Sequence, residues 1–555
     1  MNRTQRSAQL FCICILLLPA AAGAVAAADV ASSKDDAACR ALVKLPDLDI
    51  TSAELAPAAG ATPQYCYVRG MISGRIRFHV QLPLPGAWNG RFLKIGDGGK
   101  DGLLNFADNR VAQGYAVANS NTGHDVAAEP GASFAFNNRV AEIDFGYRAV
   151  HLTANAARSV VKAYYGKPPQ YSYFEGCSTG GRQALMEAQR FPYDFDGIVA
   201  GAPVNHYQAS NSGSVWILQR MFRENFAGNL AFDSKGDGSF ASLAKLNLLR
   251  DAVLAKCDAR DGITDGVIDD PLSCDFKPEV DLAGKMCPGD ANVDNCFTKK
   301  QIQTIKDVYS GAYDSRGRRI LKGKAIGSEF SWPANIIPHA GNKLFPGRLG
   351  TGGDHINFLF YENDPGVPMS DMTDLSQIPD KTRNPPEYAW WEFNIDDYTA
   401  GKGDFMRAIT DATDPNLTRF LVKSGKSGGR LLLYHGWGDG AANPEPTVDY
   451  YKDVLAETFR GDVDAARERI RLFMAPGMDH CQGGPGPSSW DRLAPLAEWV
   501  EKGKAPEYIV ATHSTNNVVD NERKICPYPQ KAVYTGPAGG QNNRANWVEG
   551  NFTCK

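Results

Sequence analysis

The stretch Glu175–Leu185, EGCSTGGRQAL, decides the fold of this 555-residue chain. Its first half is a G-x-S-x-G motif, with Ser178 at the centre and small residues around it. The preceding residues 171–175 (YSYFE) are predicted to form a short strand, and residues 181–190 a helix. A serine on a sharp turn between a strand and a helix holds its hydroxyl above the sheet, near the positive end of the helix. The motif therefore predicts a serine nucleophile.

Strands and helices alternate on both sides of this turn. Strands are predicted at 91–95, 115–119, 195–202, 430–435 and 469–475, and helices at 145–165 and 493–502. Such alternation predicts a largely parallel sheet covered by helices. Between residues 206 and 426 the alternation gives way to cysteine pairs, Gly/Pro-rich turns and aromatic clusters. The predicted fold is an α/β-hydrolase core, residues 29–205 and 427–555, with an inserted lid domain, residues 206–426.

A serine nucleophile needs a base and an acid, which follow it in the order Ser, Asp or Glu, His in this fold. Asp439 lies in HGWGDG and His480 in PGMDHC, each shortly after a predicted strand. Asp439 and His480 are therefore the predicted acid and base. Asp449 and Asp479 are the nearest alternatives for the acid, and His435 is expected to be a structural residue.

The N-terminus has the pattern of an export signal. Arg3 and Arg6 precede an apolar stretch, Leu10–Ala22, and an alanine-rich cleavage site of the A-x-A type follows. Residues 1–28 are predicted to be a signal peptide. A transmembrane anchor is disfavoured because the apolar stretch is short for a bilayer and no charged stop-transfer segment follows it. The protein is expected to be secreted or periplasmic.

Ten cysteines remain after the signal, and an even number in an exported chain favours disulfides. No two of them have the C-x-x-C spacing of a metal site. Pairing of sequential neighbours suggests four bonds: Cys39 with Cys66, Cys257 with Cys274, Cys287 with Cys296, and Cys526 with Cys554. Cys177 and Cys481 are left over, far apart in sequence and next to Ser178 and His480.

The motifs EGCSTGGRQAL, AGAP, LLLYHGWGD and GMDHC together resemble the tannase and feruloyl esterase family, over about residues 39–554. Hydrolases of mono(2-hydroxyethyl) terephthalate look like a branch of this family. The resemblance implies that Ser178 is the nucleophile, His480 the general base and acid, and Asp439 the residue that orients His480. It also implies a disulfide between Cys177 and Cys481.

The activity that this resemblance implies is hydrolysis of esters of aromatic acids, such as gallate or ferulate esters, through an acyl-enzyme. A terephthalate monoester is the alternative substrate. A serine peptidase of the same core would carry the same triad, so a peptide and an aryl ester must be compared directly. A calcium-dependent binding protein with a decayed triad is disfavoured because all three residues of the triad are present.

The oxyanion hole is expected to combine the backbone N–H of Thr179 with a glycine amide after an early strand. Gly98 and Gly99, in IGDGGKDG, are the candidates. Asp97 interrupts the glycine run, so the sequence leaves open which of the two amides points inward.

A second candidate site lies in residues 257–274, where Asp258, Asp261 and Asp265 alternate with glycines. Carboxylates and exposed carbonyls suit calcium, which takes six to eight oxygen ligands, although the spacing is not that of an EF-hand. The alternative is an acidic, solvated loop. The family resemblance implies a structural calcium held by these three side chains and by the carbonyls of Ile263 and Val267.

Substrate contacts are expected from aromatic side chains of the lid. Trp332 is the first candidate, although it also fits a core position. The weaker candidates are Phe360, Trp390 and Trp391. A free carboxylate on the substrate would need a basic residue, and Arg348 and Arg407 both remain open.

The charge balance argues against other classes of partner. The chain has 59 Lys and Arg against 63 Asp and Glu, a net charge of −4, and no run of five like charges. This balance gives no electrostatic reason to bind nucleic acid or an anionic membrane. A small aromatic ester is the expected partner, and the sequence leaves the oligomeric state open.

Overall fold

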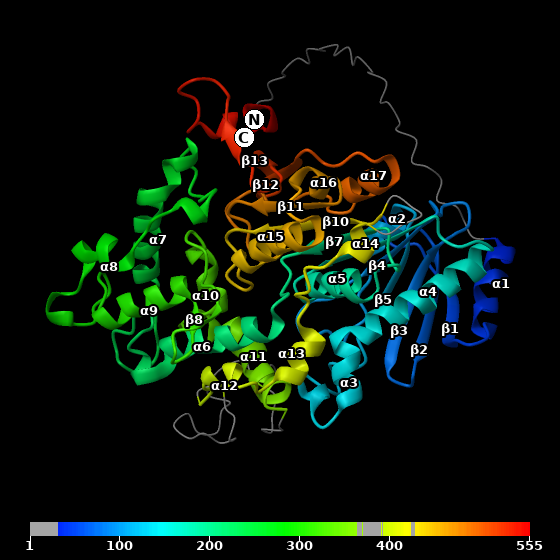
Figure 1. Cartoon of the computed structure of the whole chain (residues 1–555), viewed down its shortest axis with the longest axis horizontal. Helices are drawn as coiled ribbons and strands as arrows, with labels where there is room; N and C mark the ends of the chain where they lie inside the picture. The colour runs from blue at the N-terminus through cyan, green and yellow to red at the C-terminus, as the bar shows by residue number, and fades with distance from the viewer. Residues whose placement is uncertain (1–31, 363–368, 370–389, 391, 423–427) are drawn as a thin grey trace, which may run out of the picture.

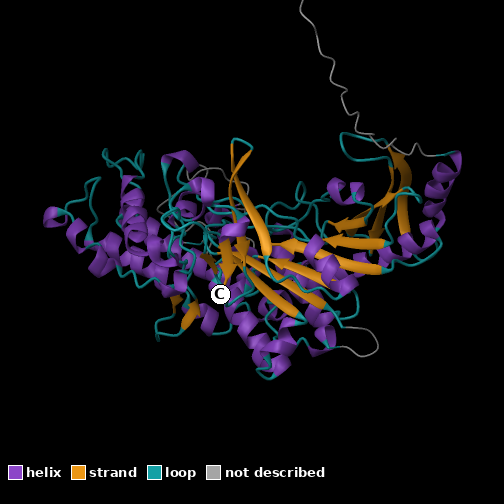
Figure 2. Cartoon of the chain, turned by 90° about the horizontal axis from the view of Figure 1, so that it is seen from above, coloured by secondary structure: helices purple, strands orange, loops and turns teal. Residues whose placement is uncertain are grey.

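The computed structural model describes residues 32–362, 369, 390, 392–422 and 428–555, so the predicted signal and Trp391 lie outside it. Within these residues a nine-stranded sheet has the order β1-β2-β3-β5-β4-β6-β7-β10-β11 (Figures 1 and 2). Its strands are β1 Asp49–Ala56, β2 Tyr65–Ile72, β3 Ile76–Pro83, β4 Arg91–Ile95, β5 Ala116–Ser120, β6 Tyr171–Cys177, β7 Gly197–Gly201, β10 Arg430–Gly436 and β11 Ile470–Ala475.

The six strands from β5 to β11 are parallel, and β1, β2 and β3 extend the sheet in antiparallel fashion. All six strands predicted from the sequence are present, each within two residues of its predicted bounds. The three antiparallel strands were not predicted. This topology, with the serine turn directly after β6, is that of an α/β-hydrolase and confirms the predicted fold.

Helices cover both faces of the sheet. The helices α4 Ala149–Tyr165, α5 Thr179–Arg190 and α15 Glu445–Phe459 pack on one face, while α2 Asp108–Ala112 and α17 Ala494–Lys502 pack on the other. Successive strand residues point to opposite faces, so Phe92 lies in the first core and Leu93 in the second. Two apolar layers thus hold the strand ends, and the loops beyond them, in fixed places.

Between β7 and β10 the described chain adds no strand to the large sheet. This inserted segment lies to one side of the sheet in Figure 1 and has its own hydrophobic core, which includes Trp332 and Trp390. Its elements are α6 Tyr207–Phe226, α7 Ala244–Cys257, α8 Pro278–Asp281, α9 Lys299–Ser310, β8 Ala312–Tyr313, β9 Arg319–Leu321, α10 Trp332–Asn335, α11 Gly347–Asp354, α12 Asp396–Thr399, α13 Asp404–Thr410 and α14 Thr418–Leu421. The predicted limits of the lid domain, 206 and 426, and its action as a lid stay predictions.

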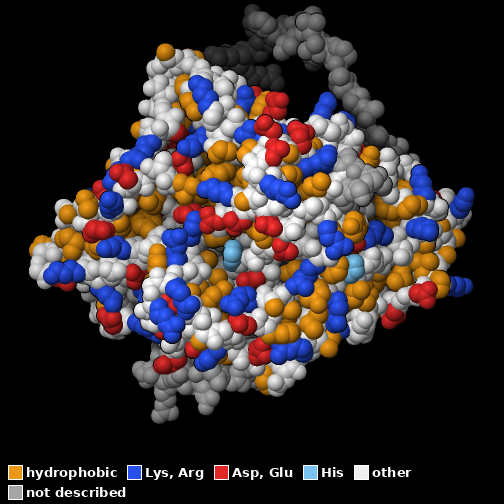
Figure 3. Space-filling model, viewed as in Figure 1, with side chains coloured by type: hydrophobic (Ala, Val, Ile, Leu, Met, Phe, Trp, Pro, Cys, Tyr) orange, Lys and Arg blue, Asp and Glu red, His pale blue; other side chains and the backbone are white. Residues whose placement is uncertain are grey.

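Among the described residues, three further α-helices and four further strands lie outside the inserted segment. They are α1 Ser33–Ala41, α3 Arg139–Ile143, α16 Val463–Arg467, β12 Ile509–Thr515, β13 Val518–Ile525, β14 Ala532–Tyr534 and β15 Phe552–Cys554. No helix among the described residues is both long and apolar enough to cross a membrane. Acidic and basic side chains lie interspersed over the face in Figure 3, as the small net charge leads one to expect.

Candidate active site

Ser178 occupies a strained turn between β6 and α5. Its φ of 63° and ψ of −124° lie outside the regions that non-glycine residues normally adopt. The glycines of the motif make the turn possible, because a Cβ on Gly176 would lie 2.6 Å from the carbonyl oxygen of Gly180, and one on Gly181 would lie 2.2 Å from that of Gly201. The turn therefore requires small residues at these positions, as the sequence analysis inferred.

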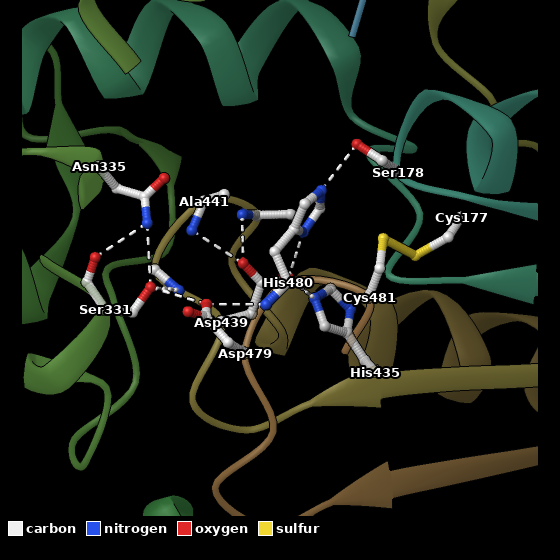
Figure 4. A network of polar contacts seen from close by, with 12 residues as sticks. Cys177, Ser178, Ser331, Asn335, His435, Asp439, Ala441, Asp479, His480 and Cys481 are labelled. Carbon is white, nitrogen blue, oxygen red and sulfur yellow. Dashed lines mark hydrogen bonds and ion pairs between the residues drawn. A yellow bond between two sulfur atoms is a disulfide. The ribbon is translucent and has the colours of Figure 1, made fainter. Parts of the chain in front are cut away.

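Three side chains from three strand ends form a continuous chain of hydrogen bonds (Figure 4). His480 Nε2 lies 2.8 Å from Ser178 Oγ, and His480 Nδ1 lies 2.7 Å from Asp439 Oδ2. Ser178 follows β6, Asp439 follows β10 and His480 follows β11, so the parallel sheet brings together residues up to 302 positions apart. The structure thus joins the three residues that the sequence predicted as nucleophile, acid and base.

The two alternative candidates for the acid, Asp449 and Asp479, make other contacts. Asp479 accepts a hydrogen bond from the backbone N–H of His480 at 2.7 Å rather than from its ring. Asp449 pairs with Lys322 at 2.7 Å. Among the three predicted carboxylates, Asp439 is therefore the one that contacts the imidazole of His480.

Burial and the neighbouring charges set the protonation states of the pair. Burial opposes ionisation of Asp439, but His480 and His435 outweigh it and hold the pKa of the carboxyl below its usual range. Burial also disfavours the charged form of His480, yet the Asp439 carboxylate raises the pKa of this imidazole above its ordinary value of 6.5. His480 is thus more basic than a free histidine.

His435, expected from the sequence to be a structural residue, makes a contact with Asp439 that was not predicted. Its Nε2 lies 3.1 Å from Asp439 Oδ2, and its Nδ1 lies 2.8 Å from Thr447 Oγ1. The other oxygen of Asp439 accepts hydrogen bonds from the backbone N–H groups of Ala441 and Ala442. Four donors therefore fix this fully buried carboxylate. The i, i+4 spacing of His435 and Asp439 across the HGWGDG turn was the available signal.

The glycine loop after β4 lies against the serine turn. A Cβ on Gly96 would lie 2.9 Å from Gly180 Cα, and the Thr179 hydroxyl donates to the carbonyl of Gly99 at 2.7 Å. Gly98 and Gly99 are exposed, and a Cβ on either would meet no atom within 4 Å. The structure thus brings Gly99 into contact with Thr179, and a side chain at Gly98 or Gly99 would point into open space.

Five disulfides join the described cysteines, and they are the five pairs expected from the sequence and the family resemblance. The bonds are Cys39–Cys66, Cys177–Cys481, Cys257–Cys274, Cys287–Cys296 and Cys526–Cys554. Cys177–Cys481 spans 304 positions and lies beside Ser178 and His480 (Figure 4). This bond links the turn that carries Ser178 covalently to the loop after β11 that carries His480, called the histidine loop below.

The structure does not bring Trp332 to an open surface. Its side chain is 0% exposed, its ring centroid lies 5.4 Å from that of Tyr309, and Nε1 donates to Ser328 Oγ at 3.0 Å. Trp390 and Phe360 are likewise buried in the core of the inserted segment. These aromatic side chains therefore pack within the segment, which was the alternative that the sequence analysis had left open.

The two arginine candidates differ in their surroundings. The charge of Arg348 acts on both Asp439 and His480, and its guanidinium donates to Asn211 Oδ1 at 3.1 Å. Burial lowers the pKa of Lys100 and of Lys324 to about 7, and Arg348 acts on both in the same direction. Arg407 instead pairs with Asp404 on its own helix at 2.6 Å. Arg348 is thus the arginine that belongs to the neighbourhood of the triad.

The predicted calcium loop, residues 258–267, contains more buried charge than the sequence indicated. Arg523, from β13, donates to Asp265 Oδ2 at 3.1 Å and to Asp269 Oδ1 at 2.5 Å. Burial raises the pKa of Asp261 to about 6, and its Oδ2 is buried without a hydrogen-bond partner. Asp258 accepts backbone hydrogen bonds from Asp265 and Gly266. These carboxylates outnumber the one arginine, so the donor set suits an additional cation.

A different group meets the geometric requirement for holding a metal. Among the described residues, His151, Glu187 and Asp194 alone bring three such ligand atoms within 4.8 Å of one another, so Asp258, Asp261 and Asp265 do not. Two of its residues already have partners, because His151 Nδ1 lies 2.6 Å from Asp194 Oδ2 and Arg158 donates to Asp194 Oδ1 at 2.9 Å. Both carboxylate oxygens of Glu187, in contrast, are buried without a hydrogen-bond partner. The group could hold a metal, but nothing identifies the ion.

The fold and the site together define an α/β-hydrolase with a serine at its strand–helix turn. Comparison with known proteins narrows this class. The model of the family "Tannase and feruloyl esterase" matches residues 64–547. The chain belongs to this family, and it is a carboxylesterase.

Its relatives include enzymes with different named substrates. Over 544 residues, 89% of this chain and 87% of the relative, it is 31% identical to a mono(2-hydroxyethyl) terephthalate hydrolase of Piscinibacter sakaiensis. Over 495 residues, 86% and 84% of the two chains, it is 30% identical to a probable feruloyl esterase B-1 of Aspergillus fumigatus. A solved esterase structure from Aspergillus oryzae, 25% identical, superposes with a TM-score of 0.75 over 94% of this chain and 100% of that one.

Proposed function

We propose that the protein is an exported serine esterase that hydrolyses esters of aromatic acids, with Ser178 as nucleophile, His480 as general base and acid, and Asp439 as the residue that orients His480. The observation that carries this proposal is the unbroken chain of hydrogen bonds from Ser178 Oγ through His480 to Asp439. The gallate or ferulate type of acid comes from the family's name and from the named feruloyl esterase relative.

The reaction follows from this geometry. His480 Nε2 takes the proton of Ser178 as Oγ bonds to the ester carbonyl carbon. The oxyanion accepts hydrogen bonds from the backbone N–H groups of Thr179 and of Gly98 or Gly99. His480 then gives the proton to the departing alcohol oxygen, and the ester C–O bond breaks. A water molecule, deprotonated by the same nitrogen, then attacks the acyl carbon, the bond between this carbon and Ser178 Oγ breaks, and His480 returns the proton to Oγ, which releases the acid and free Ser178.

A terephthalate-type monoester is the second candidate substrate. Arg348 supports it, because its charge acts on the triad while Arg407 is paired with Asp404 on its own helix. Lys100 and Lys324 add two further basic groups to the same neighbourhood. A substrate with a free carboxylate would find complementary charge there.

Calcium is proposed as a structural ion, held by Asp258, Asp261 and Asp265 and by the carbonyls of Ile263 and Val267. The buried, unpartnered Oδ2 of Asp261 and the surplus of carboxylates over Arg523 support it. When bound, the ion would supply positive charge to a loop that otherwise holds like charges together.

Export is proposed from the N-terminal pattern, and the five disulfides support an oxidising destination.

One panel of assays tests the substrate and the chemistry together. Purified protein is assayed with methyl gallate, methyl ferulate, chlorogenate, mono(2-hydroxyethyl) terephthalate and a peptide amide. We expect Ser178→Ala to lower kcat on the best ester by about 10⁴-fold or more, since the nucleophile is lost while the fold remains. Retention of a tenth of the wild-type rate, or faster cleavage of the peptide than of every ester, would contradict the proposal.

A further inference from the structure

Ser331 contacts both of the loops that carry Asp439 and His480, although it belongs to the inserted segment (Figure 4). Its hydroxyl donates to Asp479 Oδ1 at 2.7 Å. It accepts from the backbone N–H of Gly440 at 3.2 Å and from Asn335 Nδ2 at 2.9 Å. A hydroxyl offers one proton and two lone pairs, so this buried group has no hydrogen-bonding capacity left.

Asp479 extends this contact to the base. The same Oδ1 that accepts from Ser331 also accepts from the backbone N–H of His480 at 2.7 Å. On the other side, Gly440 follows Asp439 directly in the chain. One hydroxyl therefore contacts two loops. It contacts the loop after β10 that carries Asp439 (the acid loop) through Gly440, and the histidine loop through Asp479.

Close packing supports these hydrogen bonds. A Cβ on Gly440 would lie 2.4 Å from Ser331 Oγ, and a Cβ on Gly438 would lie 2.4 Å from the ring of Phe330. The bare backbone of the acid loop thus lets the short helix Glu329–Ser331 pack directly on it. Any displacement of this helix would move the groups that hold both loops.

We propose that Ser331 is a positioning residue for ester hydrolysis, which acts through Asp479 and Gly440 to hold His480 and Asp439 in register with Ser178. The inference rests on the proposed roles of the triad. Its physical basis is that small displacements between reacting groups cost rate more than they cost substrate binding. It also gives the inserted segment a part in the chemistry.

The first test compares Ser331→Ala with a matched control. Ser328→Ala removes another buried hydroxyl from the same turn, one that bonds the carbonyl of Ala325 and Trp332 Nε1 and touches neither loop. We expect Ser331→Ala to lower kcat about tenfold with KM within twofold, and Ser328→Ala to keep kcat within twofold. Both are assayed on the best ester at a temperature where circular dichroism finds each variant folded.

A double-mutant cycle tests the route through Asp479. We expect Asp479→Ala to lower kcat by a similar factor, and Ser331→Ala combined with Asp479→Ala to lose little more than either alone. Asp479→Asn, which keeps an oxygen to accept both hydrogen bonds, is expected to retain most of the rate. This variant also serves if Asp479→Ala does not fold.

Several outcomes would overturn the proposal. The first comparison contradicts it if kcat of Ser331→Ala is within twofold of wild type, or if Ser328→Ala loses as much kcat as Ser331→Ala. The cycle contradicts it if the losses of Ser331→Ala and Asp479→Ala multiply in the double variant, or if Asp479→Asn is as slow as Asp479→Ala. Activity that survives Ser178→Ala would overturn the triad and this inference with it. Activity lost in Ser178→Ala but unchanged in Ser331→Ala would overturn the positioning role alone.

Discussion

At the scale of single residues, the electrostatics of the site depend on Asp439. Its carboxylate is fully buried, and such a group is stable only when hydrogen bonds and an opposite charge replace water. Two backbone N–H groups and two histidines do so here. Because His480 and His435 both contact the same carboxylate oxygen, Asp439 Oδ2, the orientation of the base depends on both histidines.

The first residue-scale prediction concerns pH. The Asp439 carboxylate raises the pKa of His480, and protonated His480 cannot take the proton of Ser178. Activity should therefore be lost as the pH falls through this raised pKa. Asp439→Asn removes the negative charge, so we expect a lower kcat and a shift of the acid limb of kcat/KM to lower pH. Profiles of both proteins on one ester check this, and an unmoved limb would assign the acid role elsewhere.

The second residue-scale prediction concerns His435. His435→Ala should lower kcat about tenfold, the effect of roughly 1.4 kcal/mol, because Asp439 loses one of its donors but keeps His480. The loss should be smaller than that of Asp439→Asn, which also changes the charge. Rates measured side by side decide this. A loss larger than that of Asp439→Asn would give His435 a role beyond holding the carboxylate.

At the scale of elements, the Cys177–Cys481 disulfide links the β6–α5 turn to the loop after β11. On the chain-entropy estimate, a bond that closes a loop of this length destabilises the unfolded chain by about 5 to 6 kcal/mol, as an upper bound. It also holds the serine turn against the histidine loop. Stability and geometry therefore depend on the same bond.

Replacing both Cys177 and Cys481 by alanine should lower Tm and reduce kcat by a larger factor than it raises KM, even where the fold survives. Replacing Cys39 and Cys66 by alanine is the matched control, because that pair joins α1 to β2 at the far edge of the sheet. The control should lower Tm without this effect on kcat. Equal kcat losses in the two variants would remove the positioning role of the first bond.

At the scale of the whole molecule, residues 258–267 join three parts of the chain. Ile263 packs with Cys526, Ala532 and Phe552 near the C-terminus. A Cβ on Gly477, three residues before His480, would lie 2.9 Å from Val267 Cγ1. This loop is remote in sequence from Ser178, Asp439 and His480, and the tertiary structure places it against the histidine loop.

Removal of calcium is therefore predicted to destabilise the whole molecule. A metal bound only to the folded state stabilises it by mass action, so chelation should lower Tm, and the loss should be reversed in proportion to added calcium. Asp261→Ala should lower Tm without chelator. Asp251→Ala, at an exposed position of the neighbouring helix α7, should not. Elemental analysis that finds no calcium in protein prepared without chelator would refute the site.

The sequence by itself predicted the parallel core, the serine turn, the chain order of Ser178, Asp439 and His480, and four of the cysteine pairs, while the Cys177–Cys481 pair was expected from the family resemblance. Each depends on local pattern: buried strands have apolar runs, the turn needs glycines, and chain order follows strand order. The tertiary structure alone decided what distant segments place together. Examples are His435 on Asp439, Arg523 among the carboxylates of the predicted calcium loop, Trp332 in the core, and Ser331 in contact with both the acid loop and the histidine loop. These contacts join residues whose separation in sequence carries no periodic signal, so packing alone selects them.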